Sequence, residues 1–360
     1  MKRSTKQKFG QLVAVAVTLC CIAAAVLAVP HETLQRLGER AAQLSAGLRQ
    51  PRDGMELLSG YMTRASAADR VPVTSPTVVL GSVQSHAVAT TTTVVRKDGG
   101  GVILTQQMSA GSAFVQDVAI RNKSGKTVDV AKSLAHTPAL GLQKNSDKPQ
   151  VLIVHTHTTE CYMSYDAGFY NPDDPTRTND ASKNMVAVGR QVAKQLEAAG
   201  IGVIHDTAIH DQPYNGAYGH SKAAIEAYLK QYPSIKVVLD LHRDAIYEDN
   251  TTYIKPTVEI AGKNAAQLMI IVGMLNSKTV PNTHTAENLA FGVRLQQRLH
   301  RTYPGLVRPL LLADARYNQQ LTNGSLLIEV GSHANTLDEA CYTAELLGGV
   351  LAEVLEDLGA

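Results

Sequence analysis

The sequence predicts an α/β fold with a largely parallel, helix-flanked sheet, and two observations support this prediction. From Gln150 onward, short apolar runs typical of buried strands alternate with helical patterns, which is the order that builds parallel sheets. Several of these runs end in side chains that can bind a metal ion, and ligand sites of such folds lie at the carboxyl ends of the strands. The residues concerned are His155, His157, His242 and Glu329.

The composition limits the classes of function. The chain has 360 residues, a length that allows more than one domain, and 44% of them are hydrophobic. Its net charge is +2. A net charge so close to zero, with no long basic run beyond the N-terminus, does not favour nucleic acid as a partner. The four cysteines include no CxxC pair, so a thiolate zinc site is not expected.

The N-terminus has the pattern of a membrane anchor. Residues 1–10 carry four basic side chains and no acidic one, and residues 12–29 are uncharged. Such a run is close to the roughly 20 residues that span a bilayer. We therefore expect a cytoplasmic tail and transmembrane anchor over 1–30, and a single-pass cell-membrane protein whose bulk lies outside the cytoplasm. A cleaved signal peptide is the alternative interpretation.

Two further regions precede the α/β part. Residues 31–77 combine a helical pattern with a stretch rich in Ser, Ala, Thr and Pro, and are expected to form a helical stalk and linker. Residues 78–140 contain β-branched runs separated by glycine turns, which predicts a small β-rich domain. The α/β domain is then expected over 150–360.

Within 150–360 the expected elements follow one another in βα order. Gly200 suits the position after a helix, and Thr336 with Glu339 has the spacing of a capping box. Segments 253–260 and 268–275 are expected to pair around a turn at 261–264. The other strands are expected at 151–154, 201–204, 237–241 and 325–330, and the helices at 181–199, 221–231, 287–303 and 337–358.

The first strand of this domain leads into His155, His157 and Glu160. In an extended segment, residues two apart point the same way. Both histidines could therefore face one metal ion, or one could bind it while the other orients the substrate. The plain alternative for each histidine is a solvated side chain in a loop.

Two later strands carry His242 and Glu329. His242 is either a functional residue or a structural histidine bonded to the main chain. Glu329 lies within an apolar run, and a carboxylate in a buried strand is costly unless it is paired or functional. A structural ion pair is one explanation for Glu329, and a general base beside metal-bound water is the other.

Six motifs follow one another along the chain: HTHTTECY, IGVIHDTAIHD, YNGAY, LHRDA, RYNQQL and IEVGSHANT. In type and order they resemble those of the stage II sporulation protein P family. The resemblance covers roughly residue 150 to the C-terminus and implies a membrane-anchored, zinc-dependent peptidoglycan hydrolase of endospore formers. This family is described as an N-acetylmuramoyl-L-alanine amidase, with endopeptidase activity also attributed to it. It acts during engulfment with stage II sporulation proteins D and M, and its catalytic domain is similar to the zinc amidases of cell walls.

The resemblance also implies roles for particular residues. In zinc cell-wall amidases one zinc histidine follows the first strand and a second ends a later strand, which match His157 and His242. Their catalytic glutamate lies in an E-x-G segment on the last strand, which matches Glu329. This chain departs from the amidase pattern at the third ligand, because the first helix has no glutamate at its start. Glu160 is the favoured third ligand, with Asp180 and His155 as alternatives, and Arg243, Arg316 and Asn318 are candidates to contact the stem peptide or the oxyanion.

The expected function is cleavage of the amide between N-acetylmuramic acid and L-alanine of the stem peptide, in septal wall thinning and engulfment during sporulation. The expected partners are peptidoglycan, the membrane, and stage II sporulation proteins D and M. One alternative is a zinc endopeptidase that cuts stem-peptide cross-links. Another is a catalytically inactive scaffold that binds the wall.

Overall fold

The computed structural model describes residues 94–109, 114–143, 146–277 and 281–359, and the statements below refer to these residues. The predicted anchor at 1–30 and the predicted stalk and linker at 31–77 lie outside them. No helix within the described ranges is long and apolar enough to span a bilayer.

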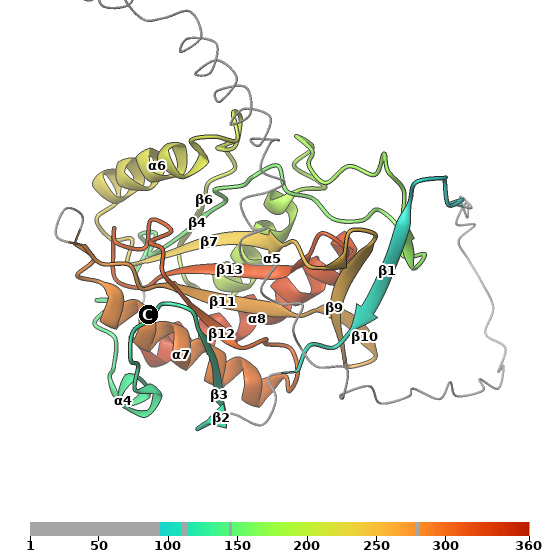
Figure 1. Ribbon diagram of the computed structural model, residues 1–360. Helices are drawn as coiled ribbons and strands as arrows, with labels where there is room; N and C mark the ends of the chain where they lie inside the picture. Colours follow the sequence, from blue (N-terminus) through green and yellow to red (C-terminus); the bar gives the residue numbers. More distant parts are fainter. Residues whose placement is uncertain (1–93, 110–113, 144–145, 278–280, 360) are drawn as a thin grey trace, which may run out of the picture. The chain divides into compact units, whose positions relative to one another are not determined.

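An eight-stranded sheet forms the centre of the described chain (Figure 1). Five of its neighbouring pairs are parallel, and β2–β3 and β11–β13 are antiparallel. The predicted α/β class with a largely parallel sheet is therefore confirmed. In spatial order the strands are β2 (Phe114–Val115), β3 (Val118–Asn122), β12 (Leu310–Ala313), β11 (Leu268–Gly273), β13 (Ser325–Ser332), β7 (Val237–Asp244), β4 (Val151–Val154) and β6 (Val203–His205).

Helices cover both faces of this sheet. Alternate residues of β4 point to opposite faces. Val151 and Ile153 pack in the large core with α5 (Met185–Ala198), α7 (Thr285–Thr302) and α8 (Leu337–Asp357). Leu152 and Val154 pack instead against Ile225 of α6 (Ala217–Gln231), so α6 lies on the other face (Figure 1). A short helix, α4 (Val130–Ala135), packs near α7.

The ends of the long helices follow signals that the sequence contains. Asn184 caps α5, and Gly200 after its C-terminus adopts a φ of 78°, in the left-handed region that glycine tolerates. Thr336 and Glu339 form both arms of the predicted capping box at the start of α8. The four predicted helices are confirmed, with starts or ends shifted by a few residues.

The region predicted to be a separate β-rich domain differs from that expectation within residues 94–140. β1 (Gly101–Gln106) pairs with β9, and β3 pairs with β12 of the central sheet. The described part of this region therefore adds strands to the sheets of the α/β part. β1 belongs to a second sheet with β5 (Phe169–Tyr170), β8 (Tyr247–Asp249), β9 (Thr252–Ile260) and β10 (Lys263–Ala266).

The predicted pairing of 253–260 with 268–275 is wrong. β9 turns through Ala261 and Gly262, both at positive φ, and pairs with β10. The chain then passes through Gln267 into β11, which joins the central sheet beside β13. The buried Gln267 side chain bonds the main chains of Met108 and Gly305, which fixes the crossing point between the two sheets. The segment after the turn therefore contains two strands, β10 and β11, where the sequence pattern predicted one.

A pair of adjacent glycines in α8 tests how tightly α5 and α8 pack. A Cβ on Gly348 would lie 2.7 Å from Gln195 Cβ of α5, whereas a Cβ on Gly349 would meet nothing within 4 Å. Overpacking typically costs about 1–3 kcal/mol, and an alanine in an open helix position gains about 0.5–1 kcal/mol over glycine. We expect Gly348→Ala to lower the free energy of unfolding in urea and Gly349→Ala to raise it. Equal shifts would show that the two helices can separate freely.

Candidate active site

The chain turns sharply after β4 and separates the two predicted histidines. Residues 156–159 form a turn, and the Thr156 main-chain N–H and hydroxyl both donate to Asp240 on β7, at 2.8 and 2.6 Å. Because the segment is not extended, His155 and His157 do not point the same way. Of the two alternatives, the one in which both histidines face one metal ion is not supported by this geometry.

His155 turns away from the other candidate residues. Its Nδ1 lies 3.1 Å from the Leu241 carbonyl oxygen and its Nε2 lies 2.9 Å from His205 Nε2, so both ring nitrogens are engaged. Gly189 of α5 leaves room for this pair, since a Cβ there would lie 2.6 Å from either Nε2. Burial and the neighbouring His205 lower the pKa of His155 to about 3. The alternative that His155 is a metal ligand is not supported by its position.

His157 points toward His242. Their ring centroids lie 5.3 Å apart with the rings nearly perpendicular, and the His157 ring also stacks on Tyr214 at 4.8 Å. Tyr218 meets the His157 ring edge-on. Burial lowers the pKa of His157, which favours the neutral ring. Its Nδ1 has no hydrogen-bond partner in the described chain. A neutral imidazole is the form that binds metal.

His242 lies on β7 between two carboxylates. Its Nε2 is 2.9 Å from Asp240 Oδ1 and its Nδ1 is 3.7 Å from Glu160 Oε2, although neither contact has hydrogen-bond geometry. Burial favours the neutral ring, but the charges of Asp240 and Glu160 outweigh burial and raise the pKa of His242 well above its ordinary value. A metal ion would have to displace this proton.

Glu160 lies in the loop after β4, and its carboxylate is beside His242. Its Oε2 accepts the Arg243 main-chain N–H at 3.2 Å, and its Oε1 lies 3.6 Å from an Arg177 Nη2. Burial alone would raise the pKa of Glu160, but His242 and Arg243 outweigh burial and hold the pKa below its usual range. Glu160 is therefore a buried, ionised carboxylate.

Glu329 on β13 is the fourth residue of this buried cluster, which consists of His157, His242, Glu160 and Glu329. Its Cα is in register with that of His242 on β7 and with that of Met269 on β11. Burial, with the nearby charge of Asp244, raises the pKa of Glu329 well above its ordinary value. Neither carboxyl oxygen has a hydrogen-bond partner within the described residues. Among the described residues, Glu329 therefore does not form the structural ion pair that was considered for it, and its buried carboxyl group has no partner.

Two predicted site residues lie elsewhere or act through other groups. The Arg243 guanidinium donates to the carbonyls of Cys161 and Thr176, so it holds the loop that carries Glu160 instead of facing the cluster. Asp180 is an exposed residue bonded to Ser182 and Lys183, whereas His157 and His242 are buried. This position does not support Asp180 as the third ligand.

The two predicted substrate-binding residues follow β12, and Asn318 contacts α6. Asn318 donates to the Tyr218 carbonyl at 2.9 Å and to the Ser221 hydroxyl at 3.1 Å. Arg316 donates to Ser277, and its Nε is buried with no partner that the structure describes. Asn318 thus anchors the loop that carries Tyr317, whose pKa burial and Glu329 raise to about 12.

The cluster fits a metal ion by its chemistry. Six buried nitrogen or oxygen atoms of His157, His242, Glu160 and Glu329 have no hydrogen-bond partner within the described ranges. Buried polar atoms almost always have one, so such a concentration indicates a ligand. Two imidazoles and a carboxylate are also a common donor set of catalytic zinc. No three His, Cys, Asp or Glu side chains of the described residues are yet arranged closely enough to hold a metal ion.

Sequence reasoning missed several residues around this cluster. Asp240 on β7 fixes the turn after β4, because it accepts the Thr156 main-chain N–H. Arg177 bonds Asp211 at 2.6 Å and lies beside Glu160. Arg177 lies in a polar loop with no apolar periodicity, so no sequence pattern drew attention to it. The aromatic residues that enclose the site are Tyr214, Tyr218 and Tyr317.

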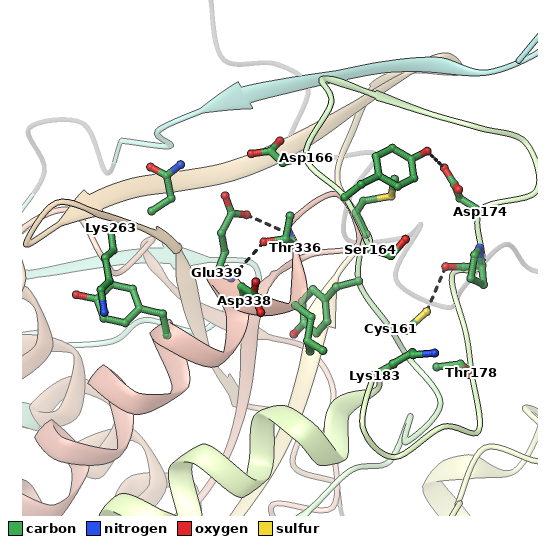
Figure 2. Close-up of a pocket in the computed structure, with 17 residues that line it drawn as sticks. Cys161, Ser164, Asp166, Asp174, Thr178, Lys183, Lys263, Thr336, Asp338 and Glu339 are labelled. Atoms are coloured by element: carbon green, nitrogen blue, oxygen red, sulfur yellow. Dashed lines mark hydrogen bonds between the residues drawn. The ribbon is translucent and has the colours of Figure 1, made fainter. Parts of the chain in front are cut away.

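A separate cavity of about 830 Å³ lies beside the residues that follow Glu160. Figure 2 shows it between the loop of Cys161 and Ser164 and the start of α8 at Thr336 and Glu339. Glu339 is held there by the capping box and by Lys255, at 2.8 Å. None of the four cluster residues lines this cavity, so it is not the candidate active site.

The fold and the cluster define an α/β protein with a histidine–carboxylate site at the carboxyl ends of parallel strands. Residues 101–352 match the family described as Stage II sporulation protein P (SpoIIP), and the chain belongs to this family. The chain is 28% identical over 227 residues to the stage II sporulation protein P of Bacillus subtilis (strain 168). That match covers 60% of this chain and 53% of the relative, so the chain spans about half the length of the curated protein it matches.

Solved structures with a weak likeness include two amidases. The CwlD amidase from Clostridioides difficile, in complex with the GerS lipoprotein, is 14% identical with a TM-score of 0.35. The match covers 58% of this chain and 98% of CwlD. The N-acetylmuramoyl-L-alanine amidase AmiC2 of Nostoc punctiforme is 10% identical with a TM-score of 0.33, over 58% and 96% of the two chains. A likeness this low says nothing about the activity of this chain.

Proposed function

We propose that this protein is a zinc-dependent peptidoglycan amidase that cleaves the bond between N-acetylmuramic acid and the L-alanine of the stem peptide. The observation that supports it best is the set of buried, unpartnered donor atoms contributed by His157, His242, Glu160 and Glu329. Membership of the stage II sporulation protein P family supports a role in sporulation.

His157, His242 and Glu160 would hold the zinc ion. When bound, zinc would supply a Lewis acid and a water molecule of lowered pKa. His242 lies on β7, and His157 and Glu160 follow β4, the parallel neighbour of β7. Asp240 and Arg243 fix the segment after β4 that carries His157 and Glu160. Such support limits the movement of ligands between metal-free and metal-bound states.

Glu329 would move the protons. Burial and the charge of Asp244 raise its pKa well above the ordinary value, and a raised pKa suits a carboxyl group that must both accept and release a proton. It would take a proton from the attacking water at a carboxylate oxygen and return it to the leaving amine nitrogen. Tyr214, Tyr218 and Tyr317 enclose the cluster and would exclude bulk water.

The family and the N-terminal sequence support a proposal for the cellular setting. We propose a single-pass membrane protein whose catalytic part lies outside the cytoplasm and acts on septal peptidoglycan during engulfment. Stage II sporulation proteins D and M are the proposed partners in that process.

Product analysis tests the proposed reaction. The purified protein is incubated with sacculi, before and after removal of metal by a chelator and with zinc added back. An amidase releases whole stem peptides with new L-alanine amino termini and leaves glycan strands bare. New amino groups within the peptides would show an endopeptidase instead. Binding without any release would show a wall-binding scaffold.

The third zinc ligand can be tested with a matched pair of variants. Glu160→Gln keeps the size of the side chain and an acceptor for the Arg243 N–H, but a neutral amide is a poor zinc ligand, so zinc content and turnover should fall. Asp180→Ala removes an exposed carboxylate that bonds only nearby residues, so both should be unchanged. Zinc per chain, measured by atomic absorption, separates the outcomes. Loss of zinc in Asp180→Ala alone would reverse the assignment.

A further inference from the structure

Arg308 is a buried arginine that is only partly bonded. It lies between α7 and β12, and its side chain has no exposed surface. Its Nη1 bonds Asp244 Oδ2 at 2.8 Å. Its Nε and Nη2 are buried and have no hydrogen-bond partner within the described ranges. Buried arginine nitrogens are rarely left in this state, so this edge of the guanidinium requires an explanation.

The position of Arg308 places it beside the candidate active site. Asp244 follows His242 by two residues on β7, and its charge raises the pKa of Glu329. The charge of Arg308 acts on the same carboxyl in the opposite direction, so the three groups are neighbours. The Arg308 main-chain N–H donates to Leu268 on β11, the strand that flanks β13 opposite β7. The Arg308 side chain therefore extends from the β11 side across β13, the strand of Glu329, to Asp244 on β7.

The chemistry of the unpartnered edge indicates the kind of ligand. Nε and Nη2 of one guanidinium present two parallel N–H donors, the fork that matches both oxygens of a carboxylate. Arg121 lies on β3 in register with Leu311 of β12, and burial and the charge of Arg308 lower its pKa while Asp244 acts in the opposite direction. The two guanidinium cations of Arg121 and Arg308, near the bonded carboxylate of Asp244, favour the binding of an anion. Arg308 is buried to the same degree as His242 and Glu329.

We propose that the Nε–Nη2 edge of Arg308 binds a carboxylate of the peptide part of the substrate, next to the amide that is cleaved. The proposal rests on the proposed amidase function and adds a specificity to it. A stem peptide with free carboxylates would be preferred over one whose carboxylates are amidated.

The test needs no variant at first. The wild-type protein is given two synthetic N-acetylmuramoyl peptides that differ only in having free carboxylates or carboxamides. We expect kcat/KM to be about 10- to 100-fold higher for the carboxylate form, mainly through KM, which is the usual size of a hydrogen bond to a charged group. Arg308→Gln should bring the ratio of the two kcat/KM values close to one. Arg301→Gln is the control, because Arg301 is an exposed arginine of α7 bonded to Asp117, and it should keep the wild-type ratio.

The outcomes separate this proposal from the proposed function. Equal cleavage of both peptides by the wild type would overturn the carboxylate site and leave the amidase function standing. If neither peptide is cleaved, binding of both to the wild type by calorimetry still decides: tighter binding of the carboxylate form, lost in Arg308→Gln, supports the site, and equal binding overturns it. If Arg308→Gln fails to fold, the comparison of the two peptides on the wild type remains decisive.

Discussion

Glu329→Gln is expected to bind zinc and sacculi almost as the wild type does, yet to lose turnover by about 10²–10⁴-fold, the usual contribution of general acid–base catalysis. Glutamine keeps the shape of the side chain but cannot accept and return a proton. Turnover, zinc content and melting temperature are measured on one preparation. Near wild-type turnover would remove Glu329 from the mechanism.

Glu339→Gln is the matched control. Glu339 is also a buried glutamate, but it is bonded to Lys255, Asn335 and the Thr336 main chain. Its change should lower the melting temperature and leave turnover largely intact. The two variants together separate the loss of a proton carrier from the loss of a structural carboxylate.

The pH dependence of stability gives Glu329 a second signature. In the zinc-free protein the folded-state pKa of Glu329 is raised above its ordinary value of 4.5. As the pH rises through 4.5, the unfolded chain releases this proton while the folded chain keeps it, so the wild type loses stability until the folded pKa is passed. Glutamine does not titrate. The melting temperature of Glu329→Gln should therefore exceed that of the wild type by an amount that grows above pH 4.5. A constant difference would show that the pKa is not raised.

The strand ends were the most predictable part of this protein. Val151–Val154 was expected and observed as a strand without change of bounds, and His242 and Glu329 lie where neighbouring strands of the sheet bring them into register. Apolar runs with β-branched residues report burial directly, and parallel order then brings their carboxyl ends together. Sequence patterns were sufficient to predict this convergence.

The loops were not predictable in the same way. His155 and His157 separate because Thr156 bonds Asp240, a contact between residues that are far apart in the chain. Arg243 is held away from the cluster by two main-chain carbonyls, which no residue pattern reports. Such hydrogen bonds depend on where the backbone of another element lies, so the direction of these side chains could be learned only from the structure.

His157→Ala and His242→Ala should each abolish digestion of sacculi and reduce zinc from about one ion per chain toward none. Each imidazole has an unpartnered nitrogen in the cluster, and a three-residue zinc site that loses one ligand keeps too few donors to retain the metal. His155→Ala provides the contrast, since His155 is equally buried but bonds Leu241 and His205. Its loss leaves those groups unpartnered at a cost of about 1–3 kcal/mol, so stability should fall while zinc content is kept. Full zinc in both His157→Ala and His242→Ala would refute the ligand assignment, and loss of zinc in His155→Ala from a folded protein would move the site to the other side of β4.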